Sequence, residues 1–325
     1  MEDIISKFEG MRVLVIGDVM IDAYLMGHVD RISPEAPVPV VAVKNKESRL
    51  GGAANVAMNL VALGAKPILC SVIGEDQEGK ELLDLLEKEK IGIEGIICSK
   101  ERITTVKTRV IAQQHQMLRI DQEISDPISE YDGFLLSKRI INDLLPACDV
   151  IIFEDYDKGV ITPSLIKQIV AEAHKRSIKI AVDPKKRNFN AYMGVDLFKP
   201  NLKELKEGYQ MDLDPSDQIN FETGIIAFMQ KMQIKNIMVT LSERGVMISN
   251  GKKFDYIPAH IRKIADVSGA GDTVISVASL CLALDLPNSQ IAGLANLAGG
   301  LVCEEVGVVP INKQRLIQES ALVKK

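Results

Sequence analysis

The sequence lacks the features that mark secreted, thiolate-metal and membrane proteins. Its five cysteines are scattered, with no CxxC pair and no cysteine–histidine spacing of the kind that holds a metal. The N-terminus, MEDIISKFEG, has no signal-peptide apolar core, and the longest uncharged stretches are too short to span a bilayer. We therefore expect a cytoplasmic protein with reduced cysteines and no membrane partner.

Basic runs and common nucleotide-binding fingerprints are also missing. The formal net charge is -5, which disfavours nucleic acid as the main partner. The densest basic cluster, DPKKRN at 183–188, is either a solvated turn or an anion site. The chain has no GxxxxGK[ST] loop and no GxGxxG motif. A dehydrogenase is thus disfavoured, and any nucleoside triphosphate must be held in another way.

What the chain does contain is an alternation of short β-branched runs with helical patterns. Its 325 residues, 46% of them hydrophobic, suit one large α/β domain with insertions or two modest domains. We expect strands at 11–19, 66–74, 149–155, 178–183, 196–201 and 234–242, and helices at 53–64, 79–91 and 164–177. This order predicts βαβ units in a doubly wound, mostly parallel sheet with helices on both faces.

Two segments depart from that rhythm, at 21–49 and 103–123. Both show alternating apolar positions without a helical period. We interpret them as strands of a small antiparallel β lid that covers the site, with decorative hairpins as the alternative. Strands with exposed edges invite pairing with a second copy, so a homodimer through the lid is expected.

Polar residues recur where successive strands end, which is where ligands bind in sheets of this type. Asp18, Asp22 and Asn55 suit the hydroxyl groups of a ligand. Glu204 could support Mg²⁺ through water, although Asn201 and Glu204 also fit a helix-capping box. Thr240 and Gly245 could line a nucleotide or simply end a strand. The remaining candidates near these strand ends are Gly51, Gly52, Asp155, Lys158, Asp183 and Lys185.

The stretch DVSGAGDTV at 266–274 carries the most specific chemistry. Gly269, Ala270 and Gly271 precede an apolar run, so their amides would lie at a helix N-terminus, where anions bind. Asp272 beside them would repel phosphate, but it suits a base that deprotonates an attacking hydroxyl. The alternative is that Asp272 only caps the helix. The pairing of anion hole and carboxylate favours phosphoryl transfer to an alcohol.

With GGAANVAMNLVALG near the start and DVSGAGDTV near the end, the sequence resembles the ribokinase-like (phosphofructokinase-B type) sugar kinases over nearly its whole length. The resemblance implies a ribokinase-like domain with a β lid, using ATP and Mg²⁺. It implies that Asp272 is the catalytic base and that the amides of 269–271 form the anion hole. Asn201 and Glu204 match the family's metal-and-phosphate motif, and Asp266 matches a monovalent-cation position, for example for K⁺. Ser268 and Asn296 join Thr240 and Gly245 as nucleotide-site candidates.

Within the family, RISPEAPVPV and RLGGAANVAMNLVALGA resemble the heptose 7-phosphate kinases of ADP-heptose synthesis, which act on the anomeric oxygen. A substrate phosphate needs cations, and Lys107 and Arg109 alternate on one lid strand so that both could face the ligand. Other candidates are Arg119, Lys158, Lys185, Lys186 and Arg187. The four histidines include no HxGH-type motif, so we expect a single kinase domain over 1–325 without a nucleotidyltransferase domain, either as a separate kinase or as a fragment of a bifunctional enzyme.

Three functions remain open on the sequence alone. The first is a heptose 7-phosphate kinase. The second is another sugar or nucleoside kinase of the same fold. The third is a non-catalytic sugar or nucleotide sensor, which would not need Asp272.

Overall fold

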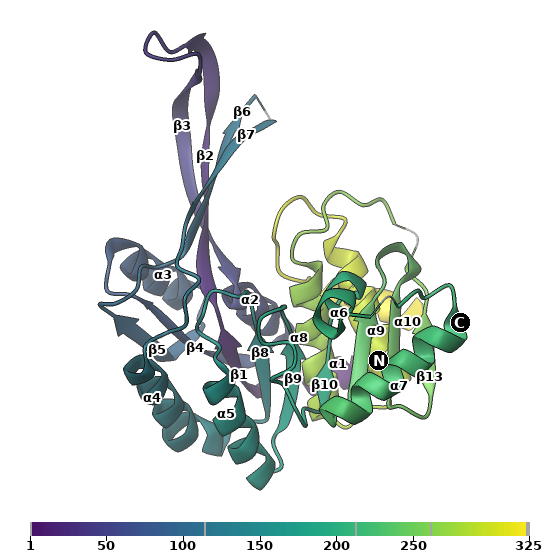
Figure 1. The fold of residues 1–325 in the computed structure, drawn as a ribbon. Coiled ribbons are helices and arrows are strands. Elements are labelled where there is room, and N and C mark those ends of the chain that lie inside the picture. Colours follow the sequence, from purple (N-terminus) through teal and green to yellow (C-terminus); the bar gives the residue numbers. More distant parts are fainter. Residues whose placement is uncertain (1, 114, 212, 261, 323–325) are drawn as a thin grey trace.

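Two β-sheets organise the chain in a computed structural model that describes residues 2–113, 115–211, 213–260 and 262–322. The larger is a nine-stranded sheet within the body, and the smaller has four strands that project from it (Figure 1). The predicted ribokinase-like architecture, a mostly parallel sheet with helices and a separate small sheet, is confirmed.

The large sheet has the strand order β13-β12-β11-β10-β9-β8-β1-β4-β5. Its strands from β5 to β11 pair in parallel, and β12 and β13 add an antiparallel edge. The strands are β1 (Arg12–Gly17), β4 (Lys66–Gly74), β5 (Gly92–Ser99), β8 (Val150–Glu154), β9 (Lys179–Asp183), β10 (Leu197–Phe198), β11 (Asn236–Thr240), β12 (Val246–Ser249) and β13 (Phe254–Ile257).

Helices cover both faces of this sheet because its central strands are apolar on both sides. Along β1, Val13 and Val15 join one core while Leu14 and Ile16 join the other, as side-chain alternation requires. The first core includes side chains of α1 (Glu2–Ser6), α2 (Ala53–Leu63), α3 (Gln77–Lys88), α8 (Ala270–Ala283), α9 (Asn288–Val302) and α10 (Lys313–Leu322). The second includes those of α4 (Glu130–Arg139), α5 (Pro163–Lys175), α6 (Leu202–Tyr209) and α7 (Gln218–Met232).

The small sheet consists of two hairpins, as the alternating segments predict. It has the order β3-β2-β6-β7, from β2 (Val19–Ile32), β3 (Pro39–Gly52), β6 (Val106–Ala112) and β7 (His115–Gln122). Each hairpin is antiparallel, and the two are joined by parallel pairing of β2 with β6. Because β2 begins at Val19, two residues after β1 ends, the lid rises directly from the carboxyl end of the central strand (Figure 1).

The strand order reverses at β1, which lies between β8 and β4. Such a switch point opens a crevice at the carboxyl ends of the strands, where ligands bind in sheets of this kind. The crevice between β1 and β8 is therefore the place to look for the site.

No helix among the described residues is long and apolar enough to cross a bilayer.

Candidate active site

The N-terminus of α8 lies between two cavities of different chemistry. Gly269 precedes the helix in the left-handed conformation, with φ of 78°, a geometry that glycine adopts without strain. Ala270 and Gly271 line one cavity, whereas Gly269 and Asp272 line the other. The amides of this first helical turn thus lie at the boundary between the two spaces, where a helix N-terminus stabilises an anion. The Ala270 amide also donates to the Val267 carbonyl at 3.3 Å.

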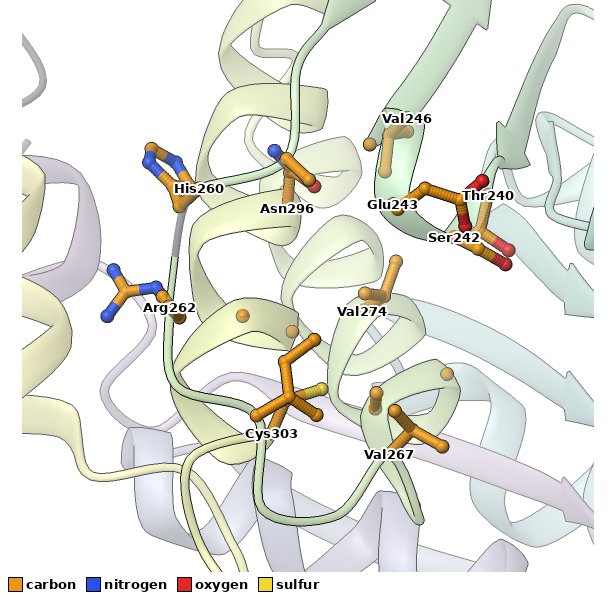
Figure 2. Close-up of a pocket in the computed structure, with 17 residues that line it drawn as sticks. Thr240, Ser242, Glu243, Val246, His260, Arg262, Val267, Val274, Asn296 and Cys303 are labelled. Carbon is orange, nitrogen blue, oxygen red and sulfur yellow. The ribbon is translucent and has the colours of Figure 1, made fainter.

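The first cavity has a volume of about 430 Å³ and is lined largely by small and apolar groups. Figure 2 shows Thr240, Ser242 and Glu243 on one side of it and His260 and Arg262 on the other. The predicted nucleotide residues Thr240, Gly245 and Asn296 all line this cavity. We call it the donor cavity.

Local structure explains how those three residues reach the donor cavity. Thr240 ends β11, and Gly245 follows a short 3₁₀ turn with φ of 89°, where an added Cβ would lie 2.1 Å from the carbonyl oxygen of Ile257. Asn296 on α9 donates from Nδ2 to the carbonyl of Pro258 at 2.8 Å. This bond fixes the 258–260 segment against α9, and with it one wall of the cavity.

The second cavity is smaller, about 180 Å³, and carries the charged lid residues. Of the predicted sugar-site residues, it brings together Asp22, Gly51, Gly52, Asn55, Lys107 and Arg109. Arg119 of β7, predicted among the lid cations, also lines it. We call it the acceptor cavity.

Lid pairing places two arginines opposite each other in the lining of the acceptor cavity. Arg109 and Arg119 are direct cross-strand partners on β6 and β7. Like charges in such positions are destabilising unless they are compensated. Arg109 pairs with Asp22, and Arg119 donates to Asp121 at 2.9 and 3.0 Å. Lys107, the third cation of this cavity, lies 3.7 Å from Glu123, so each cation of this cationic patch has a carboxylate partner.

Asp272 lies at the base of the acceptor cavity with only 8% of its surface exposed. Its Oδ2 accepts from Asn55 Nδ2 at 2.6 Å, and its Oδ1 accepts from the Tyr156 hydroxyl at 3.0 Å. Burial raises the pKa of Asp272 to about 6, against the opposing effect of these two hydrogen bonds. The carboxylate is therefore ionised at neutral pH yet basic enough to accept a proton.

A buried cluster of charges backs this carboxylate. Glu154 and Asp183, at the ends of β8 and β9, lie with Asp272 so that one oxygen of each falls within 4.8 Å of the others. Lys199 Nζ contacts Asp183 Oδ2 at 2.7 Å and supplies counter-charge. Burial raises the pKa of Glu154 well above its usual range, and the neighbouring Asp183 and Asp272 charges add to that rise.

Asn201 and Glu204 form the capping box at the start of α6. The Asn201 side chain accepts from the Glu204 amide at 2.8 Å, and Glu204 Oε2 accepts from the Asn201 amide at 2.9 Å. Glu204 Oε1 also pairs with Lys185. Both Glu204 oxygens are thus engaged, so this donor set fits a hydrated Mg²⁺ held through water better than a directly bound ion.

Asp266 and Ser268 belong to a turn before α8. Asp266 accepts from the amides of Ser268 at 3.0 Å and Gly307 at 3.1 Å. These bonds, the first of them most, lower the pKa of Asp266. Ser268 lies in this turn, outside the lining of both cavities. The carboxylate therefore ties the 266–268 turn to the 307 segment.

Asp18, Lys158, Asp183 and Lys185 lie outside the lining of both cavities. Asp18 is buried and accepts from the amides of Tyr156, Lys158 and Val160 at 2.9 to 3.1 Å. The Lys158 side chain pairs with Glu123 at 2.8 Å. The structure thus gives Asp18 a loop-holding contact, and its contact with a sugar stays a prediction.

Three residues near Asp272 were not among the sequence-based candidates: Tyr156, Glu154 and Lys199. All follow or end strands of the large sheet, so the strand-end rule could have included them. Their importance depends on contacts with Asp272 and Asp183 over long separations in the chain. The only local signal was an aromatic residue between two acids in DYDKG.

Comparison with known proteins places this site in a family. A model of the family described as pfkB family carbohydrate kinase matches residues 11–315. The chain is 39% identical over 322 residues to the bifunctional protein HldE of Syntrophotalea carbinolica and 40% identical over 307 residues to HldE of Methylobacillus flagellatus. The matches cover 98% and 94% of this chain but 65% and 62% of those proteins.

Solved structures share the fold at low sequence identity. Phosphofructokinase-2 from Escherichia coli in complex with potassium superposes with a TM-score of 0.80, at 17% identity, over 98% of this chain and all of that one. Arabidopsis thaliana ribokinase complexed with ribose and ATP gives a TM-score of 0.73 at 16% identity, and the match covers 95% of this chain and 99% of that one. These likenesses concern the fold.

Proposed function

The chain belongs to the pfkB family of carbohydrate kinases, and we propose that it phosphorylates D-glycero-β-D-manno-heptose 7-phosphate at the anomeric oxygen, giving the 1,7-bisphosphate for ADP-heptose synthesis. The observation that carries the proposal is the position of the α8 N-terminus between the donor and acceptor cavities. The identity to HldE proteins and the RISPEAPVPV stretch support the choice of sugar.

In the proposed reaction ATP occupies the donor cavity and the sugar occupies the acceptor cavity. The anomeric oxygen forms a bond to the terminal phosphorus, and the bond from that phosphorus to the bridging oxygen breaks to release ADP. Asp272 takes the hydroxyl proton. Amides at the start of α8 stabilise charge on the transferring group. Mg²⁺, supported by Glu204 through water, would neutralise phosphate charge when bound.

The acceptor cavity supports a substrate that carries its own phosphate. Lys107, Arg109 and Arg119 all line it, and Arg109 and Arg119 are opposed like charges. A dianion between the two guanidinium groups would relieve their repulsion and accept charge-assisted hydrogen bonds from both. With an unphosphorylated sugar, these cations would have only the lid carboxylates as anionic partners.

A coupled ADP-release assay tests the proposal, with ATP and Mg²⁺ as donor. The acceptors are the heptose 7-phosphate, the same heptose without phosphate, fructose 6-phosphate and ribose. We expect the highest kcat/KM with the heptose 7-phosphate. Preferred turnover of another sugar would support the kinase activity and contradict the proposed identity of the substrate. Tight ATP binding without turnover of any sugar would favour the sensor.

The proposal also includes a dimer, a cation and a compartment. Leu118 and Ile120 alternate on β7 and are 56% and 50% exposed, which supports a homodimer through the lid. Light scattering should give twice the chain mass, and a monomeric mass in both the wild type and Leu118→Glu would contradict this.

Exchange of K⁺ for Na⁺ should lower activity if Asp266 helps hold K⁺. The five unpaired cysteines support a reducing cytoplasm.

A further inference from the structure

Tyr156 lies in the lining of the acceptor cavity, in hydrogen-bond contact with the proposed base Asp272. It follows β8 at the switch point, and its hydroxyl donates to Asp272 Oδ1 over a separation of 116 residues. Burial raises its own pKa well above the usual tyrosine range, and the Asp272 charge adds to the rise. The phenol is therefore a permanent donor to the base and does not compete with it for the proton.

The backbone around Tyr156 is held by a buried carboxylate. Asp18, only 1% exposed, accepts from the Tyr156 amide at 2.9 Å and from two further amides of the same loop. Asp157 next to it adopts a left-handed φ of 57°, and its amide donates to Asp155 at 2.9 Å. The loop is thus fixed on both sides of Tyr156, so its hydroxyl has a defined direction.

Charged groups from several elements face Asp272. Glu154 on β8 and Asp183 on β9 lie on one side, and Lys199 after β10 compensates Asp183. Asn55 on α2 donates to Oδ2 from the other side. Among these groups Tyr156 is the hydroxyl donor to Oδ1. A hydrogen bond to the charged form of a carboxylate lowers its pKa, so this contact opposes the effect of burial.

We propose that Tyr156 is a positioning residue for the base: with Asn55 it clamps the two oxygens of Asp272 and keeps the carboxylate ionised and aimed at the acceptor cavity. The proposal rests on the proposed function, since it requires Asp272 to act as a base. It also accounts for Asp18, which holds the loop that carries the phenol. Tyr156 also lines the acceptor cavity, so the test must separate action through Asp272 from a direct contact with the sugar.

The test is the pH dependence of kcat in Tyr156→Phe, measured with whichever sugar the wild type phosphorylates best. Phenylalanine retains the ring, which lies 5.6 Å from Lys185 Nζ, and removes only the donor. Loss of the donor raises the pKa of Asp272, so the acid limb should move to higher pH by about one unit, with about tenfold lower kcat below the limb. An unmoved limb would overturn the proposal.

Tyr192→Phe is the matched control. Tyr192 is fully buried, whereas Tyr156 is partly exposed, and like Tyr156 it donates to a carboxylate, Asp155 Oδ2, at 2.8 Å. Its loss should cost comparable stability but leave the pH profile in place. Equal shifts of the acid limb in the two variants would show that the shift comes from a general loss of packing, and would overturn the proposal.

A double-mutant cycle separates action through the base from any other role. In an Asp272→Asn background, Tyr156→Phe should have little further effect on kcat, because the group it positions is gone. A full additional loss would contradict the proposal. If Tyr156→Phe fails to fold, site-specific 3-fluorotyrosine keeps the shape and donates more strongly. It should move the acid limb to lower pH, and no movement would again overturn the proposal.

Failure of this inference is distinguishable from failure of the proposed function. If the wild type phosphorylates no sugar, the kinase proposal fails before any variant is compared. If the wild type is active and the Tyr156→Phe profile coincides with it, only the positioning role is lost.

Discussion

The two cavities that meet at α8 differ in how they are built. The donor cavity is larger, about 430 Å³, and its lining comes from the large sheet and from segments around α8 and α9. The acceptor cavity is about 180 Å³ and depends on charged residues that the lid contributes. Shape and backbone amides therefore define the donor side, whereas charge defines the acceptor side. Substitutions should separate the two functions accordingly.

The largest expected effect comes from Asp272, which faces the acceptor cavity. Asp272→Asn should lower kcat by about 10²- to 10⁴-fold, the range for loss of a general base. The dissociation constant for ATP should change little, because the donor cavity is lined by other residues. Steady-state kinetics and calorimetric titration of ATP measure the two quantities. Wild-type turnover in this variant would remove Asp272 from the role of base.

The next largest effect is expected on the acceptor side alone. Arg119→Met should raise the KM for the phosphosugar about 10- to 100-fold, the equivalent of one charged hydrogen bond, with the KM for ATP unchanged. Lys46→Met is a suitable control, since Lys46 is an exposed lid cation outside the cavity lining. An unchanged sugar KM in Arg119→Met would show that the cationic patch does not bind the phosphate.

A smaller effect, on the KM for ATP and not on the KM for the sugar, is expected from a substitution on the donor side. Val267 lines the donor cavity and is 66% exposed, so an acidic residue there should not unfold the protein. Val267→Asp should raise the KM for ATP about fivefold through repulsion of the phosphates, more at low salt, and leave the sugar KM alone. Val306→Asp, at a 79% exposed position outside the cavity lining, is the control. Equal effects of the two substitutions would contradict the assignment.

The smallest expected effect concerns stability rather than rate. Because the folded pKa of Asp272 is raised from 3.8 to about 6, ionisation costs folding free energy as pH rises through this window. Asp272→Asn should therefore raise the free energy of unfolding at pH 7 by about 1–3 kcal/mol. The gain should fade as pH falls from 6 towards 4. Urea unfolding at these pH values measures it, and a pH-independent difference would contradict the cause.

Sequence patterns sufficed for the architecture because each local signal agreed with the fold. Apolar β-branched runs became β1, β4, β8, β9 and β11, and helical periods ended at glycines such as Gly64, which is left-handed at the end of α2. The alternating segments became the lid. Strand β5 and the edge pair β12 and β13 were not anticipated, since these strands carry weaker signals and form by pairing with neighbours.

The site was predictable where one motif held both the residue and its surroundings. The GAGD stretch supplies its own helix N-terminus, so the position of Asp272 followed from local rules. Asp18 and Asp22 could not be told apart, because only the tertiary fold directs one to the loop after β8 and the other to the acceptor cavity. Tyr156 was missed for the same reason, since its partner lies in a distant segment.

The most direct measurement of the central claim is ³¹P NMR of the reaction of the wild-type protein with ATP, Mg²⁺ and heptose 7-phosphate. The account predicts a second sugar-phosphate resonance, coupled to the anomeric proton, that grows in step with ADP. ADP formation without that resonance, or with phosphate on another hydroxyl, would contradict transfer to the anomeric oxygen at the start of α8.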